Sequence, residues 1–282
     1  MAGWTTLVQP EILAVALARE DLVVVDCRFS LLDNAAGERS YAESHIPGAV
    51  YMHLERDLSD MRVTGGGRHP WPEERHVLAR LGEVGIAPHH QVVAYDDGDL
   101  MFAPRLWFML RTLGHEKVAV LDGGWKRWTS LGLPTASARE LRASTYYPGS
   151  FDRERLVDAA GVQAHLDGGG LLIDSRAGDR FRGMNESIDR IAGHVPGAVN
   201  RPFADNLADG RMKPPTELAD AFRGLRSGRT PGDVVVMCGS GVSACANLLA
   251  MERAGLRGAR LYAGSWSDWI TDPARPVASG DA

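Results

Sequence analysis

Short apolar runs of about four to six residues recur along the chain, separated by segments with helical spacing. The runs of the first half are matched in order by runs of the second half: LVVVDCR (22–28) by LLIDSR (171–176), VVAYD (92–96) by VVVMC (234–238), and VAVLDGGW (118–125) by ARLYAGSW (259–266). Such runs are typical of strands buried on both faces of a parallel sheet. Two of the intervening segments end in Gly114 and Gly255, as helices commonly do. The pattern therefore predicts the α/β class, with a parallel sheet flanked by helices in each half of the chain.

The same order of blocks in both halves indicates an internal repeat of one domain. It includes HIPGAVY (45–51) and its counterpart HVPGAVN (194–200). A chain of 282 residues has room for two domains at roughly 150 residues each. The stretch from about Pro134 to Arg153 has no apolar run and mixes Pro, Ser and charged residues, as a linker does. We therefore predict a first domain over residues 1–139, a linker over 140–155 and a second domain over 156–282.

Composition and charge narrow the range of partners. The chain has 31 Lys and Arg against 36 Asp and Glu, so no basic surplus is offered to phosphates and no nucleic-acid partner is expected. The apolar runs are far shorter than the roughly 20 residues that span a bilayer, and the first residues lack the basic start of a signal peptide. No membrane partner is expected. Three cysteines without a Cys-x-x-Cys pair fit a reduced, cytoplasmic protein and predict neither a disulfide framework nor a metal site.

The two copies differ in chemistry at the end of the central strand. The first copy has Asp96 there, whereas the second copy has Cys238. After Cys238 come small residues whose backbone can curl so that several N–H groups point inward, before a helix begins near Ala244: Gly239, Ser240, Gly241, Val242 and Ser243. Inward N–H groups and the positive end of a helix favour negative charge. The sequence therefore predicts a thiolate nucleophile in an anion-binding loop.

Two other classes of cysteine enzyme fit these residues poorly. Cys-dependent phosphatases and arsenate reductases need an Arg six residues after the Cys to bind the oxyanion, and this chain has Ala244 there. A Cys-His hydrolase needs a His base beside the thiol, and the local sequence around Cys238 supplies none. Both classes are disfavoured.

These residues resemble the rhodanese superfamily, and in particular its tandem-domain sulfurtransferases. The resemblance covers nearly the whole chain. It rests on the doubled DxR and H-[IV]-PGAV blocks, the LDGGW and AGSW segments, APRLWFMLRTLGH in the first copy and CGSGVSA in the second. It implies two tandem rhodanese-like domains, of which the first is catalytically inactive and the second accepts sulfur on Cys238. This implication agrees with the contrast between Asp96 and Cys238.

Within this family the loop after the Cys indicates the sulfur donor. Thiosulfate enzymes carry two basic residues directly after the Cys, whereas CGSGV followed by Thr or Ser is similar to the 3-mercaptopyruvate enzymes. A thiosulfate dianion brings charge close to the sulfur, whereas the single carboxylate of 3-mercaptopyruvate lies further away. Because Gly239 and Ser240 supply no charge, a cation is expected from another segment.

The resemblance implies that Arg180, in the RFRG piece, binds the substrate carboxylate, a task that suits a guanidinium fork. Arg190 is the candidate for a second substrate arginine, although the PEP sequence that precedes this arginine in the family is replaced here. Arg176 matches Arg28 across the repeat, which favours a structural role for that pair.

The resemblance also implies a proton relay in which Ser240 contacts His69 and an acid, here Glu55 in place of Asp. The resulting hypothesis is transfer of sulfur from the small molecule 3-mercaptopyruvate through a Cys238 persulfide to cyanide or to a thiol, such as a thioredoxin or a small thiol. No metal or organic cofactor is required. Thiosulfate:cyanide sulfurtransfer and a non-catalytic rhodanese-like redox or binding module are the alternatives.

Overall fold

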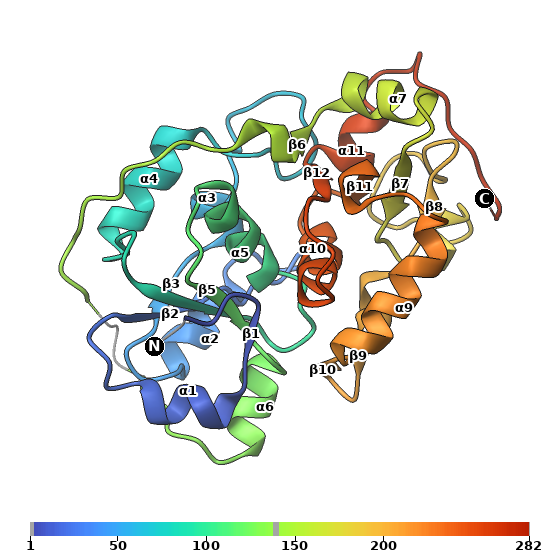
Figure 1. The fold of residues 1–282 in the computed structure, drawn as a ribbon. Coiled ribbons are helices and arrows are strands. Elements are labelled where there is room, and N and C mark those ends of the chain that lie inside the picture. Colours follow the sequence, from blue (N-terminus) through green and yellow to red (C-terminus); the bar gives the residue numbers. More distant parts are fainter. Residues whose placement is uncertain (1–2, 138–140, 282) are drawn as a thin grey trace. The chain divides into compact units, whose positions relative to one another are not determined.

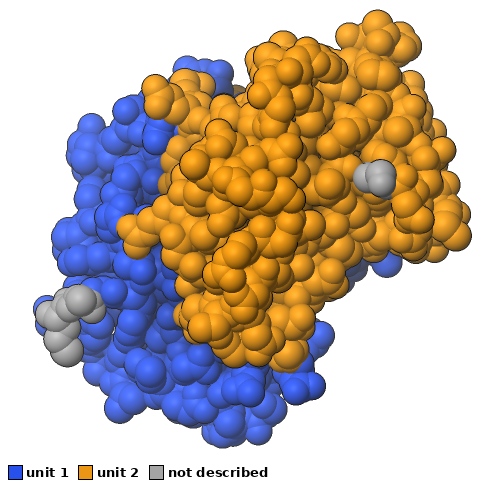
Figure 2. All heavy atoms as spheres, turned by 45° about the vertical axis from the view of Figure 1, so that its right-hand side comes forward, with its two compact units in different colours: residues 1–60, 72–152, 209–211 blue, residues 61–71, 153–208, 212–282 orange. Residues whose placement is uncertain are grey.

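The computed structural model describes residues 3–137 and 141–281 and divides the chain into two compact units. The first unit comprises residues 1–60, 72–152 and 209–211, and the second comprises residues 61–71, 153–208 and 212–282; Figure 2 colours them separately. The units differ from the predicted domains in two segments: residues 61–71 group with the second unit, and residues 209–211 group with the first. The predicted boundary between residues 139 and 140 lies outside the described residues.

The first unit contains a five-stranded sheet in the order β1-β5-β4-β2-β3 (Figure 1), and all its neighbouring strands are parallel. The strands are β1 (Leu7–Val8), β2 (Leu22–Asp26), β3 (Val50–Tyr51), β4 (Gln91–Tyr95) and β5 (Val118–Leu121). The helices are α1 (Pro10–Ala16), α2 (Ala36–Glu43), α3 (Leu54–Asp57), α4 (Glu74–Glu83), α5 (Ala103–Thr112) and α6 (Gly124–Ser130). Every residue of β2 and β4 is buried, as expected for central strands of a sheet with both faces covered.

The second unit repeats this topology with a sheet in the order β6-β12-β11-β7-β8, again parallel. The strands are β6 (Leu156–Val157), β7 (Leu171–Asp174), β8 (Val199–Asn200), β11 (Val234–Met237) and β12 (Arg260–Tyr262). The helices are α7 (Ala159–Asp167), α8 (Gly178–Phe181), α9 (Pro215–Arg226), α10 (Ala244–Arg253) and α11 (Ser265–Trp269), with 3₁₀ turns η1 (Arg153–Arg155), η2 (Phe203–Asn206) and η3 (Pro231–Asp233). A short two-stranded sheet pairs β9 (Leu207–Ala208) with β10 (Arg211–Met212).

Alternate residues of the strands face a common apolar core in each unit. In the second unit, Val235 and Met237 of β11 pack with Val162 of α7 and with Trp266 and Trp269 of α11. Residues of β2, β4, β5, α1 and α6 form the corresponding core of the first unit. Successive residues of a strand point to opposite faces of the sheet, and α7 and α11 cover one face of the second sheet. The almost wholly buried helix α10 covers the other face.

The DxR motif is a repeated structural ion pair. Asp174, at the end of β7, accepts bonds from Arg176 Nε at 3.1 and 3.0 Å and from Nη2 at 2.7 Å, and the guanidinium lies 4.8 Å from the Trp266 ring centroid. Asp26 and Arg28 make the same pair in the first unit. Both arginines are buried, so the prediction of a structural role for Arg28 and Arg176 is confirmed.

No helix in the described part of the chain has the length and apolar character that crossing a membrane requires.

Candidate active site

Cys238 lies directly after β11 and is only 2% exposed. Its backbone is held on both sides by the AGSW segment. The Cys238 N–H donates to Ser265 Oγ at 3.0 Å, and the Cys238 carbonyl oxygen accepts from the Trp266 N–H at 3.0 Å. The thiol therefore stands at the carboxyl end of a central parallel strand, where α/β proteins commonly place their sites.

The loop after Cys238 is short and tightly constrained. It leads into α10 at Ala244, as expected. Gly241 has a φ of +72°, and a Cβ on it would lie 2.2 Å from the Ala263 carbonyl oxygen, so the position requires Gly. The Gly239 carbonyl oxygen accepts from the Ser267 N–H at 2.9 Å, which ties the loop to α11.

His69 contacts this loop: its Nδ1 lies 2.8 Å from Ser240 Oγ. Both side chains are buried. The segment 61–71 belongs to the second unit, and Gly67 explains how it reaches the loop. Gly67 has a φ of +88°, and a Cβ there would lie 2.4 Å from the Gly264 carbonyl oxygen, so only Gly permits this approach. The predicted contact between Ser240 and His69 is thus present.

Glu55 belongs to the first unit, near the start of α3. Its carboxylate accepts a hydrogen bond from Asn34 Nδ2 at 2.8 Å. Its membership of the proposed relay stays a prediction.

Arg180, on α8, is held by two carboxylates. Its Nε and Nη2 donate to Glu186 at 2.9 to 3.2 Å, and Nη2 also donates to Asp189 at 3.0 Å. Burial alone would raise the pKa of Glu186, but the hydrogen bonds from Arg180 and from the backbone N–H groups of Asp189 and Ile188 outweigh it and hold that pKa below its usual value. The guanidinium is thereby fixed before any ligand arrives.

Arg68 is a site residue that the sequence analysis missed. Its Nη1 forms an ion pair with Asp189, the same carboxylate that holds Arg180. A Cβ built on Gly239 would lie 3.1 Å from Arg68 Nη2 and 3.7 Å from both Nη atoms of Arg180. Two guanidinium groups therefore flank the uncharged loop. The expectation that cations come from other segments agrees with this geometry. The Gly-rich run before His69 was the feature of the sequence that could have indicated Arg68.

Arg190 lies at the end of the same segment but is directed elsewhere. The hydrogen bond that it makes goes from Nη2 to the Ile270 carbonyl oxygen. Together with Arg68 and Ile188 it lines a cavity of about 310 Å³ in the second unit.

Asp96 occupies the position of Cys238 in the first unit. Its carboxylate accepts from the backbone N–H groups of Gly98 at 2.9 Å and of Phe102 and Ala103 at 3.0 Å. Burial, with a smaller contribution from the Asp99 charge, nevertheless raises the pKa of Asp96. In the first unit, backbone donors at this strand end thus gather on a fixed carboxylate.

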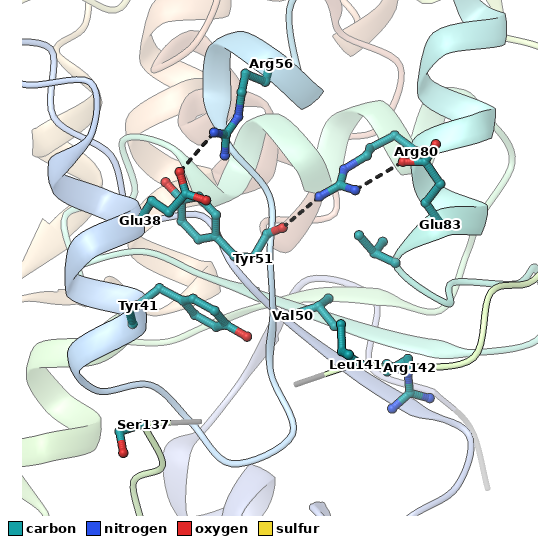
Figure 3. Close-up of a pocket in the computed structure, with 12 residues that line it drawn as sticks. Glu38, Tyr41, Val50, Tyr51, Arg56, Arg80, Glu83, Ser137, Leu141 and Arg142 are labelled. Atoms are coloured by element: carbon teal, nitrogen blue, oxygen red, sulfur yellow. Dashed lines mark hydrogen bonds and ion pairs between the residues drawn. The ribbon is translucent and has the colours of Figure 1, made fainter. Parts of the chain in front are cut away.

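The first unit also contains a cavity of about 390 Å³, which Figure 3 shows. Its charged lining is largely paired. Arg56 donates to Glu38 at 2.9 Å, and Arg80 donates to Glu83 at 3.2 Å and to the Tyr51 carbonyl oxygen at 3.4 Å. The lining includes none of the predicted site residues, so we do not assign the reaction to this cavity.

The fold consists of two copies of one parallel sheet. One copy has a thiol in a tight loop and the other has a carboxylate at the same position, and together these features define the class of protein. The chain belongs to the family with rhodanese-like domains: the model of the Rhodanese-like domain matches residues 9–131 and again residues 158–272. The predicted pair of tandem rhodanese-like domains is confirmed.

Individual relatives narrow the comparison. A Pseudomonas aeruginosa protein named "Probable 3-mercaptopyruvate sulfurtransferase" is 48% identical over 273 residues, which cover 95% of this chain and 96% of that protein. A Mycobacterium tuberculosis protein whose name contains the words thiosulfate sulfurtransferase is 36% identical, and the match covers 99% of each chain. The solved structure of 3-mercaptopyruvate sulfurtransferase from Leishmania major has a TM-score of 0.83 at 28% identity and covers 95% of this chain and 74% of that one.

Proposed function

We propose that this protein is a sulfurtransferase that takes a sulfur atom from 3-mercaptopyruvate onto Cys238 and passes it to a thiol. The observation that carries the proposal is the charge around the nucleophile. The loop has no cation of its own, and Arg180 and Arg68 reach Gly239 from other segments. This arrangement suits a donor whose single carboxylate lies away from the reacting sulfur. The relatives named for this activity support it.

The first half-reaction forms a persulfide. The Cys238 thiolate attacks the thiol sulfur of 3-mercaptopyruvate, and the carbon–sulfur bond breaks with its electron pair moving to carbon. The resulting enolate takes up a proton and leaves as pyruvate, while Cys238 carries the second sulfur. The backbone N–H groups of the loop and the start of α10 stabilise the negative sulfur. Arg180 binds the carboxylate, and the exposed Arg190 is a further candidate for this role.

The second half-reaction regenerates the thiolate. An acceptor thiolate, from a thioredoxin or a small thiol, attacks the outer sulfur, and Cys238 leaves as a thiolate. Cyanide replaces the thiol in an assay. The three cysteines are free and buried, which supports a reducing cytoplasmic location; cell fractionation tests this location.

Ser240 and His69 form the proton relay of the first half-reaction, with Glu55 as its third candidate member. We expect Ser240→Ala and His69→Ala each to lower kcat by about 100-fold, the usual worth of a general acid or base, with little change in KM. If the two groups act as one unit, the double variant loses no more than the single variants. Losses that multiply in the double variant would contradict the relay.

The donor is tested by steady-state kinetics on one preparation. We expect kcat/KM for 3-mercaptopyruvate to exceed that for thiosulfate by at least about 100-fold, or about 2.7 kcal/mol of transition-state binding. The name of the Mycobacterium tuberculosis relative contains thiosulfate as the donor of that protein. A preference of this protein for thiosulfate would change the proposed donor but not the proposed persulfide on Cys238. No turnover with either donor would favour the binding or redox module.

A further inference from the structure

Two open guanidinium edges lie beside the Cys238 loop. Arg180 uses Nε and Nη2 for Glu186 and Asp189, and Arg68 uses Nη1 for Asp189. Among the residues that the structure describes, Arg180 Nη1 and Arg68 Nη2 have no such partner, and Arg68 Nε is buried without a hydrogen bond. Of these donors only Arg68 Nε is buried. The amino groups Arg180 Nη1 and Arg68 Nη2 belong to side chains that are 18% and 28% exposed, so a small anionic ligand can reach them.

The open edges converge on Gly239. A Cβ on that residue would lie 3.1 Å from Arg68 Nη2 and 3.7 Å from Arg180 Nη1. The two open donors therefore lie close to one another, next to the residue that follows Cys238. A carboxylate has two oxygens and matches a pair of N–H donors.

Asp189 keeps the two guanidinium groups in this arrangement. One of its oxygens pairs with Arg68 and the other with Arg180, and its side chain is only 4% exposed. Its own backbone N–H donates to Glu186 at 3.0 Å, which fixes the position of the bridge. A buried carboxylate between two arginines orients both and offsets their mutual repulsion.

We infer that Arg68 is the second arginine that binds the carboxylate of the sulfur donor, and that Asp189 is the residue that positions Arg68 and Arg180 for it. This inference rests on the proposed function. Arg190 is a poorer candidate because it is exposed and its Nη2 is bonded to the Ile270 carbonyl oxygen. Arg68 keeps one amino group on Asp189 and directs the other, Nη2, to the place where the loop itself has no charge.

Steady-state kinetics of Arg68→Met test this role. We expect KM for 3-mercaptopyruvate to rise on the order of 10- to 100-fold, as for loss of charge-assisted hydrogen bonds, with kcat within about threefold of the original. Pyruvate carries the same carboxylate without the thiol, so its inhibition constant is expected to rise by the same factor. Methyl pyruvate, which lacks the charge, reports binding that does not depend on Arg68.

Arg182→Met is the matched control, because this arginine lies in the same RFRG piece and its side chain is 38% exposed. Its kinetic constants are expected to stay unchanged. Asp189→Asn is expected to raise KM and the pyruvate inhibition constant together. Arg68→Lys keeps the positive charge but loses the planar guanidinium, so its KM is expected to lie between those of the original protein and Arg68→Met. It replaces Arg68→Met in the test if that variant does not fold.

Two results would overturn the inference. One is an unchanged KM in both Arg68 variants, and the other is a rise in KM on Arg190→Met but not on Arg68→Met. Failure of the proposed function is a separate outcome: the original protein would then not turn over 3-mercaptopyruvate at all.

Discussion

Replacing Cys238 by Ser is expected to abolish sulfur transfer, with kcat falling by at least about four orders of magnitude. A hydroxyl is a far weaker nucleophile than a thiolate and cannot hold a transferable sulfur. Cys238 is also the cysteine of the described chain that lies at a strand end between a tight Gly loop and two guanidinium groups. The variant is therefore expected to bind the donor without consuming it.

Mass spectrometry of the protein after donor addition checks this expectation directly. The original protein is expected to gain the mass of one sulfur atom on the peptide that contains Cys238, and Cys238→Ser to gain none. Cys27→Ala is the control, because Cys27 is buried in the first unit and burial, together with the nearby Asp26 charge, raises its pKa well above the usual value. Added sulfur on another cysteine, or residual turnover in Cys238→Ser, would contradict the mechanism.

The fold was predictable because the repeat constrains it twice. Strands of Val and Leu in the same order in both halves left little freedom in topology, and the two sheets have corresponding strand orders. The contrast between Asp96 and Cys238 could also be predicted from the sequence. Both residues directly follow a central strand, and the loop next to each is formed by the residues that come next in the chain.

The surroundings of Cys238 were harder to predict because they depend on contacts between distant segments. Arg68 reaches the loop only because Gly67 lets segment 61–71 pack against Gly264, almost 200 residues further along the chain. No local pattern reports such a contact. The same contact accounts for the place of segment 61–71 in the second compact unit, whereas the first domain was predicted as one continuous range over residues 1–139.

Arg180→Met is expected to lower kcat/KM for 3-mercaptopyruvate by about 100- to 1,000-fold, or about 3 to 4 kcal/mol. The reason is that the substrate carboxylate loses a charged group to which it hydrogen-bonds. It is also expected to destabilise the fold, because Glu186 and Asp189, 2% and 4% exposed, each lose a cationic partner. Urea unfolding measures the second effect and steady-state kinetics the first. Arg182→Met is again the control, expected to change neither.

The loss of stability is expected to depend on pH in a definite direction. Arg180 lowers the pKa of Glu186 in the folded protein, so its contribution is present above the unfolded value of about 4.3 and is lost as pH falls through the folded value. The stability gap between the original protein and Arg180→Met is therefore expected to be full at neutral pH and to shrink below about pH 4. A gap that is constant with pH would mean that packing of the arginine stem, rather than its charge, stabilises the fold.

A second substitution separates the two roles of Arg180. In Arg180→Met with Glu186→Gln, a neutral amide replaces the buried carboxylate that lost its Arg180 partner, and Arg176 Nη1 gives up its 3.5 Å ion pair with Glu186. Stability at neutral pH is therefore expected to recover part of its loss. Activity is not expected to recover, because the cation that faces Gly239 is still absent. If kcat/KM returned together with stability, Arg180 would act only by holding the segment in place, and Arg68 would then be the arginine that binds the donor carboxylate.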